Sequence, residues 1–292
     1  MNGTLEQLTG AVREIAGGLK VDHCITEKNN GNKRAAVLVE VKAGLMASIY
    51  VDKLLTEIED GRMTLAEAAE QVMTVYNENR NDSAEVGRVD LNKITSKKFI
   101  LENVHRRLVN TEMNKEMLKS CPHKDFLDLS ITYAVSLPQA GEYASIVRIS
   151  NELLQVAGIS PEELDEQAKA NDRREWINMD MDMMLKDLGL IDSARSELGL
   201  VVASNRAKYY GASVMADIQY MQFLYDLIGE DFYILPSSVH ECLMLPSSMS
   251  DNMTYLRMMI KSVNTTEVDN TDILSDTLYK YNSITRSVEI AA

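Results

Sequence analysis

The strand-length hydrophobic runs of this chain occur in neighbouring pairs, and a short segment of turn-forming residues separates the members of each pair. The clearest pair is 21–27 and 34–42, joined by Asn29-Asn-Gly31-Asn32, in which Asn-Gly supplies the positive φ of a tight hairpin. Two further pairs are 126–137 with 143–150 and 232–235 with 239–245. Paired strands favour antiparallel sheets over a doubly wound fold. We therefore predict the α+β class, with antiparallel sheets built from hairpins and packed against amphipathic helices.

Helices are predicted between these hairpins. Ser160-Pro161-Glu162-Glu163 is the strongest start signal, with serine at the N-cap, proline at the first helical position and glutamate at the third. Thr64-Leu-Ala-Glu67 and Thr4-Leu-Glu-Gln7 have the form of capping boxes. Other helices are expected over 52–60, most of 92–120, a Met-rich stretch near 175–188, 212–228 and 251–263. A short strand near 107–109 is an alternative within 92–120, and other strands are expected over 46–51, 199–203 and 278–281.

The length of 292 residues is enough to bury a large core. We expect a single globular unit, or two intimately packed halves of about 1–110 and 111–292 with no clear linker. No apolar run approaches the roughly 20 residues of a membrane helix, and the opening residues do not resemble a signal peptide. Three scattered cysteines are an odd and sparse set, typical of reduced thiols. These features predict a cytoplasmic protein.

The net charge of −14 disfavours direct binding to nucleic acid or to an anionic membrane. Segment 92–124 reverses the balance locally, with eight basic residues against three acidic ones. A solvated helical face explains this segment most simply, and a docking patch for an acidic partner is the alternative. We expect the partner to be another protein or a small ligand, with no membrane involved.

Candidate metal ligands are poorly spaced. A thiol stands beside an imidazole in His23-Cys24, Cys121-Pro-His123 and His240-Glu-Cys242, and zinc accepts such mixed ligands. The regular ligand pairs of zinc modules are nevertheless missing. Asn178-Met-Asp180-Met-Asp182 resembles the start of a calcium loop, but glycine and glutamate are absent from the positions where that loop needs them. We predict no metal site and no cofactor.

A nucleophilic site could be built from Ser237 or Ser238 with His240 and Glu241. A serine nucleophile needs a base within reach and an oxyanion hole, and it often lies in a G-x-S-x-G turn that this chain lacks. Serines that follow Pro236 are also what a hairpin turn requires. Known phosphate-binding motifs are missing as well.

One loop mixes basic and aromatic residues: Asn205-Arg-Ala-Lys208-Tyr-Tyr-Gly211, directly after a predicted strand. A surface connection is the simpler interpretation. The functional alternative is a recognition loop in which Asn205 and Lys208 bind the ligand.

The stretch from Gly229 to Glu241, Gly-Glu-Asp-Phe-Tyr-Ile-Leu-Pro-Ser-Ser-Val-His-Glu, resembles the signature of the bacterial domain-of-unknown-function family numbered 5688. Pro122-His123 followed by Phe126-Leu-Asp128-Leu is similar to a second stretch of that family. Further similarity covers nearly the whole chain in order: Ile49-Tyr-Val, Glu59-Asp-Gly61, Asn151 to Leu164, and Ser204-Asn205 to Gly211-Ala.

This resemblance implies no activity, because the family has none established. It does single out polar positions that match family motifs, while the three cysteines are not part of the pattern. These positions are His123, Asp128, Asn205, Ser237, Ser238, His240 and Glu241.

Three hypotheses about function follow. The leading one is a non-catalytic binding protein, because no nucleophile with its base, metal set or phosphate loop is evident. The second is an enzyme of unfamiliar type that uses His123, His240 and Glu241, since histidine titrates near neutral pH. The third is an acidic decoy or inhibitor from a mobile element that opposes host defence. We expect His123 and His240 to lie apart, each held by backbone hydrogen bonds.

Overall fold

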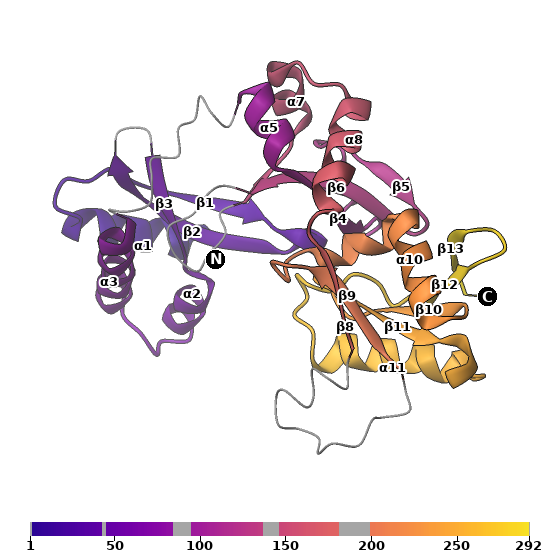
Figure 1. The fold of residues 1–292 in the computed structure, drawn as a ribbon. Helices are drawn as coiled ribbons and strands as arrows, with labels where there is room; N and C mark the ends of the chain where they lie inside the picture. The colour runs from indigo at the N-terminus through magenta and orange to yellow at the C-terminus, as the bar shows by residue number, and fades with distance from the viewer. Residues whose placement is uncertain (1, 43–44, 84–94, 137–145, 181–198, 292) are drawn as a thin grey trace. The chain divides into compact units, whose positions relative to one another are not determined.

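The computed structural model describes residues 2–42, 45–83, 95–136, 146–180 and 199–291 (Figure 1). These residues form two compact units: those up to 83 make unit 1, and those from 95 onward make unit 2. The division falls earlier in the chain than residue 110. The α+β class with antiparallel sheets is confirmed in both units.

Unit 1 is a three-stranded antiparallel sheet, in the order β1-β2-β3, with helices packed against one face (Figure 1). Its elements are α1 (Asn2–Ile15), β1 (Val21–Glu27), η1 (Asn29–Gly31), β2 (Lys33–Lys42), β3 (Leu45–Tyr50), α2 (Asp52–Glu59) and α3 (Leu65–Ser83). The first predicted hairpin is confirmed, because β1 and β2 pair along their length and both Asn30 and Gly31 adopt positive φ. Leu5, Leu8 and Val12 of α1 pack into the core over the sheet.

The two predicted capping boxes have different outcomes. Before α3, the Thr64 hydroxyl accepts a hydrogen bond from the Glu67 amide, and the Glu67 carboxylate accepts one from the Thr64 amide, as predicted. The box at Thr4 is wrong, because α1 already begins at Asn2. The Thr4 hydroxyl instead donates to the Glu59 carboxylate at 2.8 Å, which joins α1 to the end of α2.

Unit 2 contains a six-stranded sheet in the order β13-β12-β10-β11-β9-β8 and a four-stranded sheet in which β6 pairs with β4, β5 and β7. Its elements in the first half are α5 (Lys97–Asn103), β4 (Val104–Asn110), α6 (Lys115–Leu118), β5 (Lys124–Phe126), β6 (Leu129–Ser136), β7 (Ile146–Arg148), α7 (Asn151–Ala157), α8 (Pro161–Asp172) and β8 (Trp176–Asp180). Those in the second half are β9 (Val201–Asn205), η2 (Gly211–Ala216), α10 (Ile218–Ile228), β10 (Phe232–Pro236), β11 (Cys242–Pro246), η3 (Ser247–Met249), α11 (Met253–Thr266), β12 (Tyr279–Asn282) and β13 (Ser287–Ile290).

Strand β10 shows how the six-stranded sheet buries both of its faces. Phe232 and Ile234 belong to the main core of unit 2, which α10 and the alternate residues of β6 also enter. Tyr233 and Leu235 belong to a second core against α11. This division follows the two-residue period of a strand. The burial of both faces explains why β10 is apolar throughout.

The other two predicted hairpins are confirmed as antiparallel pairs, β6 with β7 and β10 with β11. The turn predicted at 139–141 lies outside the described residues. The start signal at Ser160 is also confirmed, because the Ser160 hydroxyl accepts a hydrogen bond from the Glu163 amide at the beginning of α8.

Three predictions of helix were wrong. Segment 104–110 is strand β4, which confirms the short strand allowed near 107–109 but extends it to seven residues in place of helix. The charged Arg106 hides the alternating pattern of this strand because its side chain faces the interior and is 2% exposed. The described part of the Met-rich segment, including the calcium-like Asn178, is strand β8, and 181–188 lies outside the described residues. The helix predicted over 212–228 begins only at Ile218, because Asp217 caps it by accepting the Gln219 and Tyr220 amides. Residues 211–216 form the 3₁₀ helix η2 instead.

Arg106 is stabilised by a buried carboxylate network in unit 2. Its Nε donates to Asp172 Oδ2 at 2.8 Å, and its Nη2 lies 3.7 Å from Asp217 Oδ2. Arg173 donates to the same Asp217 carboxylate through two nitrogens, at 2.9 and 3.3 Å. Asp217 is 2% exposed, so the network crosses the interior from β4 to the start of α10.

Candidate functional site

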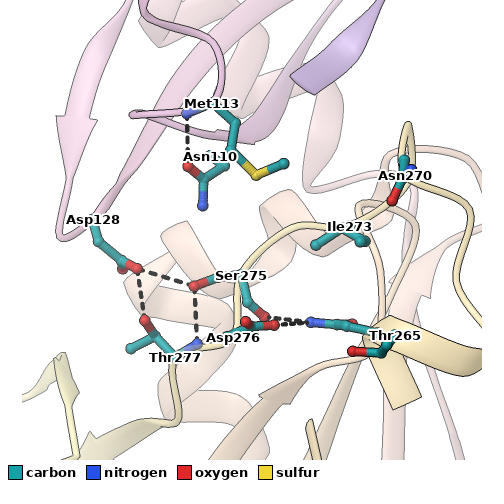
Figure 2. Close-up of a pocket in the computed structure, with 10 residues that line it drawn as sticks. Asn110, Met113, Asp128, Thr265, Asn270, Ile273, Ser275, Asp276 and Thr277 are labelled. Atoms are coloured by element: carbon teal, nitrogen blue, oxygen red, sulfur yellow. Dashed lines mark hydrogen bonds between the residues drawn. The ribbon is translucent and has the colours of Figure 1, made fainter. Parts of the chain in front are cut away.

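A cavity of about 470 Å³ lies in unit 2 beside the turn between β5 and β6. Asn110, Met113 and Asp128 line it on one side, and seven residues between Asn264 and Thr277 line it on the other. Figure 2 shows these two groups of side chains facing one another. We call this cavity the Asp128 pocket. Its volume falls within the range of about 300–1,000 Å³ that is usual for small-molecule sites.

Asp128 accepts three hydroxyl hydrogen bonds in the pocket wall. Its Oδ2 accepts from Ser275 at 3.0 Å and from Thr277 at 2.8 Å (Figure 2), and its Oδ1 accepts from the Tyr279 phenol at 2.7 Å. Burial raises the pKa of Tyr279, and the hydrogen bond to Asp128 raises it further, so the phenol remains a donor. Asp128 therefore ties the β5–β6 turn to the segment that enters β12.

Asn264, in the last turn of α11, lines the pocket with an incompletely satisfied amide. The residue is 4% exposed. Its Nδ2 donates to the Ser275 carbonyl at 3.1 Å and to Asp276 Oδ1 at 2.7 Å, which fixes the orientation of the amide. Its Oδ1 has no hydrogen-bond partner among the described residues. A buried acceptor left in this state costs about 1–3 kcal/mol, so a donor that reached it would be stabilising.

Several residues singled out from the sequence meet elsewhere in unit 2, around His240. Asn205 closes its own loop, because its side chain donates to the Tyr209 carbonyl at 2.9 Å and accepts from the Tyr209 amide at 3.1 Å. Ser238 accepts a hydrogen bond from the His240 amide at 3.0 Å. The Tyr209 ring stacks on the His240 ring with centroids 5.1 Å apart. We call Asn205, Tyr209, Tyr210, Ser238, His240 and Asp272 the His240 cluster.

Both ring nitrogens of His240 have partners within this cluster. Nδ1 accepts a hydrogen bond from the Tyr210 amide at 3.1 Å, which requires that Nδ1 carry no proton. Nε2 therefore carries the proton of the neutral ring and lies 3.4 Å from Asp272 Oδ1. A general base needs a free nitrogen within reach of the proton that it removes. Both ring nitrogens thus help to hold the loop that contains Tyr210.

The loop of the His240 cluster is strained and tightly packed. Lys208 and Tyr210 both adopt the left-handed backbone region, with φ of 50° and 55°. Each such residue costs of order 1–3 kcal/mol and persists only where its surroundings enforce it. Gly211 provides part of this enforcement, because a Cβ there would lie 2.6 Å from the Asn205 amide and 2.7 Å from the His240 carbonyl.

Arg107 of β4 extends the cluster with a cation. Its guanidinium carbon lies 4.0 Å from the Tyr210 ring centroid and 5.6 Å from that of Tyr209. Burial lowers the pKa of Arg107, and the two tyrosines partly offset that effect. The guanidinium thus contributes cation–π stabilisation to the loop.

The remaining predicted site residues do not join either group. His123 is exposed, and its Nδ1 lies 3.0 Å from the Cys121 carbonyl. Each histidine has a backbone hydrogen bond as expected, local for His123 but with the distant Tyr210 for His240. The separation of the two histidines remains a prediction. Lys208 is exposed, and the half-buried side chains of Glu241 and Ser237 make no hydrogen bond or ion pair with the described residues. The strands that follow His123 and His240 belong to different sheets of unit 2.

The candidate metal ligands are dispersed. Within the described ranges, no three His, Cys, Asp or Glu side chains gather closely enough to hold a metal ion. All three cysteines are free thiols, and burial raises the pKa of both Cys121 and Cys242.

The basic residues of segment 92–124 are largely paired. Six of the eight lie within 4 Å of a carboxylate, namely Lys97, Lys98, Arg106, Lys115, Lys119 and Lys124. Arg107 stacks on the tyrosines, and Lys93 lies outside the described residues. The hypothesis of a docking patch remains a prediction. No helix in the described part of the chain is long and apolar enough to cross a membrane.

Sequence reasoning identified Asp128 but missed the rest of its pocket. The signal that could have located it is the segment 264–277, which is dense in Asn, Asp, Ser and Thr between a helix and a strand. Residues of these types are usual in turns, so the segment alone indicates only a loop.

Comparison with protein families gives one match. The model of the family described as "Family of unknown function (DUF5688)" matches residues 4–283 of the chain, which is nearly its whole length. Neither the curated proteins nor the solved structures include a match.

Proposed function

The chain belongs to DUF5688, a family of unknown function, and we propose that it is a non-catalytic binding protein that holds a small polar ligand in the Asp128 pocket. The observation that carries this proposal is the cavity itself, about 470 Å³ in volume and lined mainly by amide, hydroxyl and carboxylate side chains. A small number of converging polar groups in a concave site is the usual arrangement of small-molecule recognition.

The state of Asn264 supports ligand binding over a purely structural role for the cavity. Most buried polar atoms of proteins have a hydrogen-bond partner, and the Asn264 Oδ1 has none among the described residues. The neighbouring Asp128 network, by contrast, is fully hydrogen-bonded and holds the pocket wall in place before a ligand arrives. Such preorganisation reduces the entropic cost of binding.

An enzymatic function has less support. The two ring nitrogens of His240 are engaged by the Tyr210 amide and by Asp272, and the Ser238 hydroxyl meets the His240 backbone rather than its ring. Neither arrangement activates a nucleophile. His123 is positioned by its own local hydrogen bond.

We also propose that the protein works in the bacterial cytoplasm. Three free thiols, of which Cys121 and Cys242 are buried, are in keeping with a reducing compartment.

A pocket-blocking substitution tests the binding function. Thr265 lines the Asp128 pocket and is exposed, and its neighbour Thr266 is exposed but does not line it. Both hydroxyls donate to a carbonyl four residues earlier in α11, so the two sites are closely matched. Thermal unfolding of the wild type, Thr265→Trp and Thr266→Trp would be measured with a panel of amino acids, amines, sugars and polyols.

We expect at least one class of compound to raise the melting temperature of the wild type and of Thr266→Trp but not of Thr265→Trp. Binding to the native state alone stabilises by about 2.7 kcal/mol at a hundredfold excess over Kd, which is readily detected. Stabilisation that persists in Thr265→Trp, or no stabilisation by any compound, would contradict the proposal. Chemical conversion of a bound compound would contradict its non-catalytic part.

A further inference from the structure

We infer that the ligand of the Asp128 pocket is a small organic cation with an ammonium or guanidinium group. This inference rests on the proposal that the pocket is the ligand site, and it adds the charge and hydrogen-bonding character of the ligand.

The charge of the lining is the first support. Two carboxylates, Asp128 and Asp276, line the pocket, and its described lining includes no basic side chain. Asp276 is exposed and accepts a neutral amide hydrogen bond from Asn264, so no cation neutralises it through the contacts of the described residues. A half-enclosed site with one sign of charge concentrates ligands of the opposite sign.

The hydrogen-bonding state of the lining is a second and independent support. The hydroxyls of Ser275 and Thr277 donate to Asp128, and both Nδ2 hydrogens of Asn264 are donated to acceptors in the pocket wall. The group left over is an acceptor, the buried Oδ1 of Asn264. A ligand group that satisfies this acceptor must be a donor, and an ammonium or guanidinium group brings three to five donors without an acceptor.

The dimensions of the pocket favour an organic cation over a bare metal ion. Calcium requires six to eight oxygen ligands at about 2.3–2.6 Å, converging on one point. The Asp128 oxygens are already occupied by three hydroxyl hydrogens, and no metal-sized cluster of ligands exists among the described residues. A cavity of about 470 Å³ instead suits a molecule of several heavy atoms.

A pair of probes separates charge from shape. Calorimetric titration of the full chain would compare 1,4-diaminobutane with 1,4-butanediol, which has the same carbon chain with neutral hydroxyl ends. We expect the diamine to bind at least about tenfold more tightly than the diol, and its affinity to fall as salt is raised from about 10 to about 150 mM, because salt screens partly exposed charges.

Asp276→Asn removes one charge while keeping an oxygen for the Asn264 amide. We expect this variant to bind the diamine about tenfold more weakly, whereas Asp251→Asn should bind it as the wild type does. Asp251 is an exposed carboxylate at the other end of α11, about 20 Å away at 1.5 Å per residue. Unfolding curves of both variants would verify that neither substitution unfolds the chain.

The outcomes distinguish this inference from the proposed function. Equal binding of diol and diamine, or an unchanged diamine affinity in Asp276→Asn, would overturn the inference that the ligand is a cation. The proposal that the pocket binds a ligand would still stand if Thr265→Trp abolished diol binding. Saturable binding of calcium alone that excludes the diamine would also overturn it. No pocket-dependent binding of any probe would refute both.

Discussion

At the scale of single residues, Asp217 joins the start of α10 to Arg173 and Arg106. No sequence motif indicated this role. The Asp217 carboxylate caps α10 and accepts two hydrogen bonds from Arg173. It also lies against Arg106, which is itself almost fully buried. Burying such a cation is unfavourable unless its carboxylate partners are kept. The stability of unit 2 therefore depends on a residue that lies away from the proposed ligand site.

Removing the carboxylate of Asp217 should destabilise the protein strongly. Asp217→Ala leaves Arg106 with one fewer counter-charge and deprives α10 of its cap, and we expect a loss of about 3–5 kcal/mol in the free energy of unfolding. Urea denaturation at pH 7 would measure it. A loss below about 1 kcal/mol would show that the network is not coupled to folding.

The same residue predicts a dependence of stability on pH. Burial alone raises the pKa of Asp217, but the hydrogen bonds and charges of Arg173 and Arg106 outweigh it, so the pKa of Asp217 in the folded protein lies below its ordinary value. Its stabilising contribution is therefore complete above about pH 5 and is lost as the pH falls through the unfolded and then the folded pKa. We expect Asp217→Asn to lose less stability than the wild type between about pH 5 and pH 3. Parallel profiles for the two proteins would contradict this assignment.

At the scale of elements, the loop between β9 and η2 is shaped by close contacts with the turn before β11. Gly211 allows the backbone of this loop to approach His240, and the Ser204 hydroxyl donates to the His240 carbonyl at 2.8 Å. The Tyr210 amide meets the His240 ring from the same loop. These contacts are local to unit 2 and explain why two strained residues are tolerated there.

Two glycine substitutions separate close packing from backbone entropy. Gly211→Ala would place a methyl group 2.6–2.7 Å from backbone atoms, and we expect it to destabilise the protein by more than about 1 kcal/mol. Gly10→Ala in α1 meets nothing within 4 Å and should stabilise it by about 0.5–1 kcal/mol. Thermal unfolding of both variants would measure the two effects. Equal changes in stability for the two variants would mean that the loop around Gly211 shifts to accommodate the new methyl group.

The elements that could be predicted from sequence are those whose signals are local. The Asn30-Gly31 hairpin and the Ser160 cap depend on residues next to one another, and both are confirmed. Only a short part of strand β4, near 107–109, could be anticipated, because the buried partner of Arg106 is Asp172, far along the chain. A charged residue that faces the core interrupts the pattern from which strands are predicted.

At the scale of the whole molecule, the Asp128 pocket depends on contacts that sequence order does not reveal. The Asn110 amide reaches the Leu274 carbonyl across a separation of 164 residues, and Asp128 meets Tyr279 across 151. Asp128 could be singled out by the resemblance to a family motif, but its partners could not. The sequence likewise placed His240 among the candidates for catalysis, and only the fold assigns both of its ring nitrogens to partners.

The family assignment and the geometry address different questions about the molecule. The match over residues 4–283 establishes kinship without an activity. The pocket of unit 2 provides chemical grounds for a function, because the charge and the leftover acceptor of its wall describe the ligand that it would complement. The central claim is therefore that this pocket is a ligand-binding site.

A crystal structure of the protein with 1,4-diaminobutane would test that claim most directly. We predict ligand density inside the Asp128 pocket, with one nitrogen within about 3.2 Å of an oxygen of Asp276 or Asn264. A pocket that holds only water while the diamine occupies another part of the molecule would contradict the account.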